Sequence, residues 1–331
     1  MSEFMRSHSE RTTEKSEDVL ATIFERAKKA HATIGLADTE DERVTKAVEI
    51  IQNESLAKPV LIKADFFHSL PLQEQEVLLR TVQEVRAARG KPISDDEARG
   101  WLSTDTKYVA AAMVKAGKLD GYVAGNISST ENTLRPALQI IGAPDGYASS
   151  FFIMLFPDDR PLFFADCGFN YDPNSEELAK IAVDTAHTVQ ELGIEPRIAF
   201  LSFSTAGSSA HEHVRKVQTA IAKARELAPD LAISEHELQL DAALDKSVAE
   251  RKVRGSGVAG NANVLIFPDL DSGNMAYKMA NLLGVRAIGP IMQGLSAPAN
   301  DLSRGCSVQD IVDVVAVTAM QAGALKNKRE S

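Results

Sequence analysis

Cysteine is scarce in this chain, and its two cysteines, Cys167 and Cys306, lie far apart. Neither has the short Cys or His spacing of a metal site or a redox pair. The sequence therefore predicts no metal site and no redox pair. A reducing compartment, the cytoplasm, is the expected location.

Long apolar runs are also missing. No segment approaches the roughly 18 consecutive apolar residues that a membrane-spanning helix requires. The first residues, MSEFMRSHSERTTEKSED, are polar and charged and contain no apolar core of a secretory signal. We therefore expect no membrane partner, and we interpret residues 1–17 as a flexible tail.

Positive charge is in deficit, since 36 Lys and Arg residues stand against 46 Asp and Glu residues and give a net charge of −10. A nucleic-acid surface needs clustered cations to neutralise phosphates, so we expect no nucleic-acid partner. Small anionic substrates are not excluded, because a few local arginines and helix N-termini can hold them.

The chain does contain the alternation of helices and strands that is typical of α/β proteins. Helical periodicity predicts helices over 17–32, 40–54, 72–89, 104–117, 175–193 and 209–227. Runs of strand length lie between them: PVLIKA, DGYVAG, FFIMLF, PLFFAD, RIAFLSF, NVLIFPD and VRAIGP. FFIMLF and PLFFAD are joined by a Pro/Asp turn and predict an antiparallel hairpin. The other strands predict doubly wound, mainly parallel sheets with helices on both faces.

The length of 331 residues is sufficient for two domains. We place the first α/β domain at residues 1–147 and the second at 148–290, beginning with the hairpin. The expected fold class is therefore α/β, with two doubly wound domains.

Three segments have the form strand, polar loop, helix, which favours anion binding at the helix N-terminus. The first carries Ser128, Ser129 and Thr130 and then Arg135 early in the helix; the second carries Ser204, Thr205, Gly207 and Ser208; the third runs from residue 289 into a last helix and includes Asn300. Each set has an ordinary structural alternative, because Ser and Thr before a helix are usually N-caps. The recurrence of three such loops favours a ligand rich in phosphate.

Asp310 has two compatible interpretations. Its spacing from Ser307 is that of a capping box, in which the side chain at the third helical position satisfies an unpaired backbone N–H. The same carboxylate, close to Ser303 and Arg304, could take a proton from an incoming nucleophile.

Six ordered blocks resemble those of the phosphate acetyltransferase family (phosphotransacetylases), which is related to the phosphate butyryltransferases. These blocks are DGYVAGNISSTENTLRPALQIIG, FFADCGFNYDPNSEELAKIA, FLSFSTAGS, ELQLDAA, GSGVAGNANVLIFPDLDSGN and IGPIMQGLSAPANDLSRGCSVQDI. The resemblance implies two α/β domains with a cleft between them, similar to the isocitrate and isopropylmalate dehydrogenases. It also implies that residues 291–331 return to the first domain and that the protein is a homodimer.

The resemblance further implies transfer of an acetyl group between acetyl phosphate and coenzyme A in a ternary complex, with coenzyme A as substrate and no other cofactor. Carried over by residue, Asp310 matches the base for the thiol, and Ser303 and Arg304 match the groups that stabilise the transition state. Arg135 and Arg86 match substrate-anchoring arginines. The loop residues named above, together with Asn300, are expected to bind substrate.

The chain departs from the family pattern at several positions. Ala206 and Asn261 stand where the family often has Lys, and Ser128 stands where it often has His. The stretch VLIKADFFHSLPLQEQEV is short for the family's first domain, which predicts a lost strand or helix there.

Three alternatives to an acetyl-specific enzyme remain. One is a propionyl- or butyryl-specific phosphate acyltransferase, and another is a non-catalytic module that binds an acyl-CoA effector. The third, a dehydrogenase, lacks support: Gly255, Gly257 and Gly260 match the dinucleotide pattern GxGxxG, but a helical stretch precedes them and a strand follows, which is the reverse of the required order.

Overall fold

The computed structural model describes residues 16–157 and 161–330. Most of the predicted tail therefore lies outside the described residues, and so does the centre of the predicted hairpin turn, 158–160. The last two residues of that tail, Ser16 and Glu17, belong to the first turn of helix α2.

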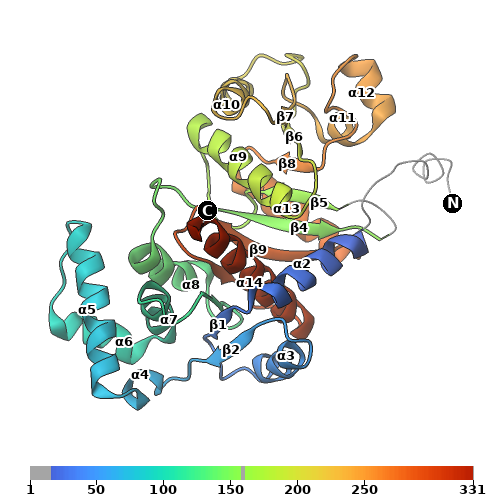
Figure 1. Cartoon of the computed structure of the whole chain (residues 1–331). Coiled ribbons are helices and arrows are strands. Elements are labelled where there is room, and N and C mark those ends of the chain that lie inside the picture. The colour runs from blue at the N-terminus through green and yellow to red at the C-terminus, as the bar shows by residue number, and fades with distance from the viewer. Residues whose placement is uncertain (1–15, 158–160, 331) are drawn as a thin grey trace.

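Two separate sheets organise the chain (Figure 1). The first has four parallel strands in the order β10-β3-β1-β2. Its members are β1 (Thr33–Leu36), β2 (Lys58–Leu61), β3 (Gly121–Ala124) and β10 (Ala299–Asp301). β1 and β3 are almost completely buried, as strands covered by helices on both faces are.

The second sheet has six strands in the order β7-β6-β8-β5-β4-β9. Its members are β4 (Ser149–Leu155), β5 (Leu162–Ala165), β6 (Arg197–Phe200), β7 (Ala232–Ile233), β8 (Val264–Ile266) and β9 (Arg286–Gln293). The predicted hairpin is confirmed, because β4 and β5 pair antiparallel with Phe151 opposite Ala165. Strands β5, β8, β6 and β7 pair in parallel, which confirms the predicted mixed α/β architecture.

Helices cover both sheets. They are α2 (Ser16–Ala30), α3 (Glu42–Asn53), α4 (Phe66–Ser69), α5 (Leu72–Ala88), α6 (Asp95–Thr104), α7 (Thr106–Lys115), α8 (Thr130–Pro136), the π-helix η1 (Ala137–Ile141), α9 (Ser175–Glu191), α10 (Glu212–Leu227), α11 (Leu240–Leu244), α12 (Lys246–Lys252), α13 (Leu270–Leu282) and α14 (Val308–Glu330). The sequence did not predict β1, β7, β10, α4, α6, α11 or α13. Strand β7 has only two residues and β10 has two polar side chains among three, which leaves too little apolar pattern to detect.

Helix α14 packs against α2 and α3 and lies side by side with α2 in the middle of the molecule (Figure 1). By length and composition it could cross a membrane, contrary to the expectation that no segment approaches this limit. In the structure 61% of its apolar window is buried, and Ile311, Val315 and Ala319 belong to the largest core cluster. Its apolar character is therefore that of a core helix.

The division into domains at 147 and 290 stays a prediction. Strand β9 spans the second of these positions, and β10, directly after it, joins the first sheet. The 289–310 segment consequently links the two sheets, and it contains the third predicted loop.

Candidate active site

Three loops meet at the carboxyl ends of β1, β3 and β10, which are neighbours in the first sheet. Because the strands are parallel and in register, with Gly35 opposite Tyr122 and Tyr122 opposite Ala299, their following loops emerge at the same edge. This is the edge at which open α/β sheets bind ligands. The loop after β3 and the loop after β10 are the first and third of the predicted binding segments.

A groove of about 320 Å³ lies beside the loop after β10. Ser303, Cys306 and Asp310 line one side of it, and Tyr277 and Asn281 of α13 line another. The structure therefore brings two of the three predicted catalytic residues to one concave surface.

Asp310 forms the predicted capping box. The backbone N–H of Ser307 donates to Asp310 Oδ2 at 2.7 Å, and the N–H of Asp310 donates to Ser307 Oγ at 3.1 Å. Only one carboxylate oxygen is engaged by these contacts, and the half-buried side chain also lines the groove. The structural and the catalytic interpretations of Asp310 are therefore compatible in geometry.

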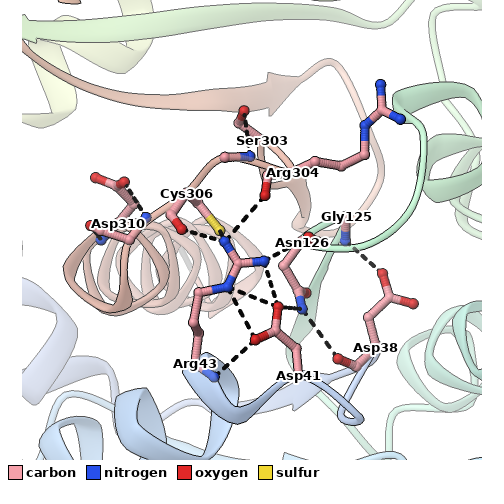
Figure 2. Close-up of polar contacts among 11 residues, drawn as sticks. Asp38, Asp41, Arg43, Gly125, Asn126, Ser303, Arg304, Cys306 and Asp310 are labelled. Carbon is pink, nitrogen blue, oxygen red and sulfur yellow. Dashed lines mark hydrogen bonds and ion pairs between the residues drawn. The ribbon is translucent and has the colours of Figure 1, made fainter.

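Ser303 and Arg304 occupy an exposed turn between β10 and α14. Within residues 16–157 and 161–330, the guanidinium of Arg304 makes no hydrogen bond or ion pair, and Figure 2 shows it extending away from the contacts around it. Ser303 Oγ accepts a hydrogen bond from the N–H of Gly305 at 3.3 Å and keeps its own proton for another partner. Both side chains are thus available to a ligand.

A polar network that the sequence did not predict lies beneath this turn (Figure 2). Asp38 is buried and accepts hydrogen bonds from Gly125 N at 3.0 Å and from Ser128 Oγ at 3.3 Å. Lys107 Nζ lies 3.3 Å from the same carboxylate, and it compensates the charge that burial would penalise. The signal for this network was the acidic TEDER segment after β1, which sequence patterning alone cannot distinguish from a solvated helix start.

The three predicted residues of the loop after β3, Ser128, Ser129 and Thr130, have different partners in the structure. Ser128 points to Asp38 and so reaches the network. Ser129 is the N-cap of α8 and accepts a hydrogen bond from Asn132 N at 3.3 Å, the structural role considered above. Thr130 lies against the buried carboxyl of Asp301.

Asp301 ends β10 and is 1% exposed. Burial raises the pKa of Asp301 to about 6, against the polar side chains of Thr130 and Thr133, which favour the charged form, and the nearby Asp38 raises this pKa further. A carboxyl with a raised pKa in the folded state holds its proton more strongly than it does in the unfolded chain. The protonated carboxyl of Asp301 therefore contributes to stability at acid pH, and this contribution is lost as the pH rises from about 4 to about 6.

We predict that the wild type loses stability relative to Asp301→Asn as the pH rises from ~4 to ~7. The free energy of unfolding of the wild type minus that of the variant should fall by no more than about 3 kcal/mol. The asparagine is similar in shape and does not titrate, so the pH-dependent part of the difference belongs to Asp301. Urea unfolding at several pH values measures it. A difference that stays constant over this range would contradict the assignment.

Arg135 and Arg86 both lie near Tyr108 of helix α7. Arg135 forms an exposed ion pair with Glu131 at 2.7 Å, and Arg86 lies over the ring of Trp101 with 5.6 Å between its Cζ and the ring centroid. Burial raises the pKa of Tyr108, and the charges of Arg135 and Arg86 oppose that shift. Both arginines therefore lie near Tyr108, each with its own partner, and the structure records no contact between them and the 303–310 segment among the described residues.

The second predicted loop, after β6, has its donors engaged by the protein's own carboxylate. Gly207 N and Ser204 Oγ donate to Glu237 Oε1 at 2.7 and 2.8 Å. Ser208 Oγ accepts from Thr205 N at 3.1 Å. Burial alone would raise the pKa of Glu237, but the hydrogen bonds from Gly207, Gln218 and Ser204 outweigh it and lower the pKa.

Ser204 and Thr205 are buried, and the donors of Ser204 and Gly207 already bind an anionic group. Gly207 and Ser208 are exposed. The assignment of Ser204, Thr205, Gly207 and Ser208 to substrate binding stays a prediction, and it would require a ligand to replace Glu237. Sequence patterning could not find Glu237, because it lies on a separate segment of the chain.

The assignment of Asn300 to substrate binding also stays a prediction. It is fully buried in β10, where Nδ2 donates to Thr318 Oγ1 and Gln321 Oε1, and Oδ1 accepts from Met292 N at 2.7 Å. A side chain with these partners connects the strand to α14 and cannot contact a substrate in this conformation.

Comparisons with known proteins identify the family of the chain. The family model described as phosphate acetyl/butaryl transferase matches residues 18–319. A phosphate acetyltransferase of Thermoanaerobacterium thermosaccharolyticum is 45% identical over 329 aligned positions, which cover 92% of this chain and 99% of the relative. The aligned positions outnumber the covered residues of this chain, so the relative has residues that this chain lacks.

Solved structures give the same result. A phosphotransacetylase from Streptococcus pyogenes superposes with a TM-score of 0.83 at 38% identity, covering 92% of this chain and 98% of its own. The EutD phosphotransacetylase from Staphylococcus aureus superposes with a TM-score of 0.81 at 34% identity, covering 94% of this chain and 100% of its own.

Proposed function

Because the chain belongs to the phosphate acetyl/butaryl transferase family, we propose that it exchanges an acetyl group between phosphate and the thiol of coenzyme A. The observation that carries the proposal is the groove at the N-terminus of α14, where Asp310 and Ser303 line one surface and the adjacent Arg304 has a guanidinium without a partner among the described residues. The 303–310 loop supplies, within eight residues of sequence, a base, a hydroxyl and a permanent cation.

The chemistry follows from these three groups. The carboxylate of Asp310 takes the proton of the coenzyme A thiol, since the thiolate is the nucleophile. The thiolate attacks the acetyl carbonyl, a C–S bond forms, and the C–O bond to phosphate breaks as phosphate leaves. Negative charge grows on the carbonyl oxygen and on the phosphate, where Arg304 and the Ser303 hydroxyl stabilise it. Transfer is direct, within a ternary complex, and the proposal requires no cofactor other than coenzyme A as substrate.

We propose that Arg135 and Arg86, which both lie near Tyr108, anchor phosphate groups of coenzyme A while its thiol reaches the groove. Arg135 is exposed, and its ion pair with Glu131 is of the weak surface kind that a phosphate can replace.

We also propose that the protein is a homodimer in the cytoplasm. Met275, Met279 and Leu282 share one face of α13 and are 65%, 63% and 89% exposed. Exposed apolar side chains at this spacing form a stripe that a monomer would leave in water. A second copy of this chain packing on the stripe would bury it, and α13 would still line the groove with Tyr277 and Asn281.

The double variant Met275→Glu, Met279→Glu is therefore expected to shift the protein from dimer to monomer, because two charges would have to be buried in an apolar contact. Sedimentation velocity measures the change, and the exposed-site variant Arg80→Glu is the control. A wild type that is monomeric at all concentrations, or a double variant that stays dimeric, would contradict the placement on α13.

The reaction is tested in the direction of acetyl phosphate synthesis. We expect release of free coenzyme A from acetyl-CoA, followed with a thiol reagent, only when phosphate is present. Propionyl-CoA and butyryl-CoA in parallel assays measure the acyl preference. Release without phosphate would indicate a thioesterase, and no release from a sample that still binds acetyl-CoA would favour the non-catalytic module.

A further inference from the structure

The side chain of Arg43, near the start of α3, lies under the 303–306 turn, although the two are far apart in sequence (Figure 2). Its guanidinium reaches all three loops at the carboxyl edge of the first sheet. Nη1 donates to the carbonyl oxygens of Arg304 and Cys306 at 3.1 and 2.5 Å. Nη2 donates to the carbonyl oxygen of Asn126 at 3.0 Å and to Asp41 at 2.5 Å.

All donors of this guanidinium are engaged within the protein. Nε donates to Asp41 at 2.9 Å, so the N–H of Nε and the four N–H groups of Nη1 and Nη2 each have an acceptor. Asp41 is itself fixed, because it is the N-cap of α3 and accepts from Asn126 Nδ2 at 3.0 Å. The hydrogen bond from Arg43 is the main reason that the pKa of Asp41 lies well below its usual range.

Arg43 therefore has no donor left for a substrate phosphate, and it differs in this from Arg304. What it can do is hold the backbone on both sides of Gly305. The two carbonyl groups that it binds belong to the turn that presents Ser303 and Arg304, and residues 303–305 of this turn are exposed. A guanidinium suits this task, because its planar fork can bind several acceptors at once, whereas an ammonium group concentrates its donors at one point.

We propose that Arg43 is a positioning residue for acetyl transfer: it clamps the 303–306 turn to the loops after β1 and β3 and thereby fixes the direction of Ser303 and Arg304. The proposal rests on the function proposed above. Misplacing reacting groups by about 1 Å can reduce a rate about 100-fold without changing substrate affinity. Arg43 thus acts on the rate of transfer and not on binding.

The test is Arg43→Lys in the full-length protein, assayed for thioester formation from acetyl phosphate and coenzyme A. Lysine keeps a positive charge beside Asp41 but cannot reach both carbonyl groups of the turn. We expect kcat to fall between about tenfold and about 100-fold, with the KM values for both substrates within about threefold of the wild type.

The matched control is Arg197→Lys. Arg197 also binds a backbone carbonyl, that of Asn261 at 2.7 Å, but it lies at the start of β6, away from the groove. The variant Arg197→Lys measures how much thermal stability is lost with such a contact, and the kcat of this variant should be unchanged. Asp41→Asn, which leaves Arg43 in place but weakens its anchor, is the second variant in case Arg43→Lys does not fold. Asp41→Asn should also lower kcat, but by less than Arg43→Lys does.

Three results would overturn the proposal: an unchanged kcat in Arg43→Lys, a loss that appears only in KM, or an equal loss of kcat in Arg197→Lys. An inactive wild type would instead overturn the proposed function, so the two failures are distinguishable.

Discussion

Replacing Asp310 by Asn should lower kcat by about 10²–10⁴-fold and leave the KM for coenzyme A nearly unchanged. The asparagine side chain can still accept the hydrogen bond from Ser307 N through its oxygen, so the cap of α14 is retained. The carboxylate that takes the thiol proton is lost. Initial rates over a range of coenzyme A concentrations separate the two parameters.

Ser307→Ala is the matched control, because it removes the other half of the capping box and leaves the carboxylate. We expect it to cost about 1 kcal/mol of stability and to change kcat little. If Asp310→Asn lost activity only through the KM, or if Ser307→Ala lost as much kcat as Asp310→Asn, the carboxylate would be a cap and not a base.

Arg304→Lys should lower kcat by about 10²–10³-fold, the scale of removing a donor that stabilises developing charge. The substitution keeps the positive charge but replaces the planar fork that can bind two oxygens at once. No hydrogen bond of the Arg304 side chain within the described residues is lost, so thermal stability should not change. The thioester assay and a thermal melt of the same sample measure both quantities.

Arg80→Lys is the control, since Arg80 forms only an exposed ion pair with Glu76. Its activity should equal that of the wild type. Near-normal turnover of Arg304→Lys would show that a point charge is sufficient at this position and would contradict a bidentate role for Arg304.

The main helices and most strands could be predicted because their apolar periodicity is set by burial. The helix over 175–191 and the β4–β5 hairpin are examples. Strand β10 could not be predicted, because two of its three residues, Ala299–Asp301, have polar side chains that the sequence pattern would place at the surface. Helix α13 was missed because its exposed methionines and leucine obscure the usual amphipathic pattern.

The candidate site could be proposed from the sequence where its residues lie in one segment. Ser303, Arg304 and Asp310 fall within eight residues, and the structure places Ser303 and Asp310 on one groove. Arg43 and Glu237 could not be found in the same way, because their partners are brought to them by the fold. The burial of Asn300 could not be predicted, because its partners Thr318 and Gln321 lie in a separate helix that the fold brings to it.

The most direct test of the central claim is the exchange of labelled phosphate into acetyl phosphate, measured with and without coenzyme A. Reversible acetyl transfer in a ternary complex predicts that label enters acetyl phosphate only when coenzyme A is present, and that Asp310→Asn slows this exchange. Exchange without coenzyme A would reveal a covalent acetyl-enzyme, and no exchange under either condition would show that the groove at α14 does not carry out this reaction.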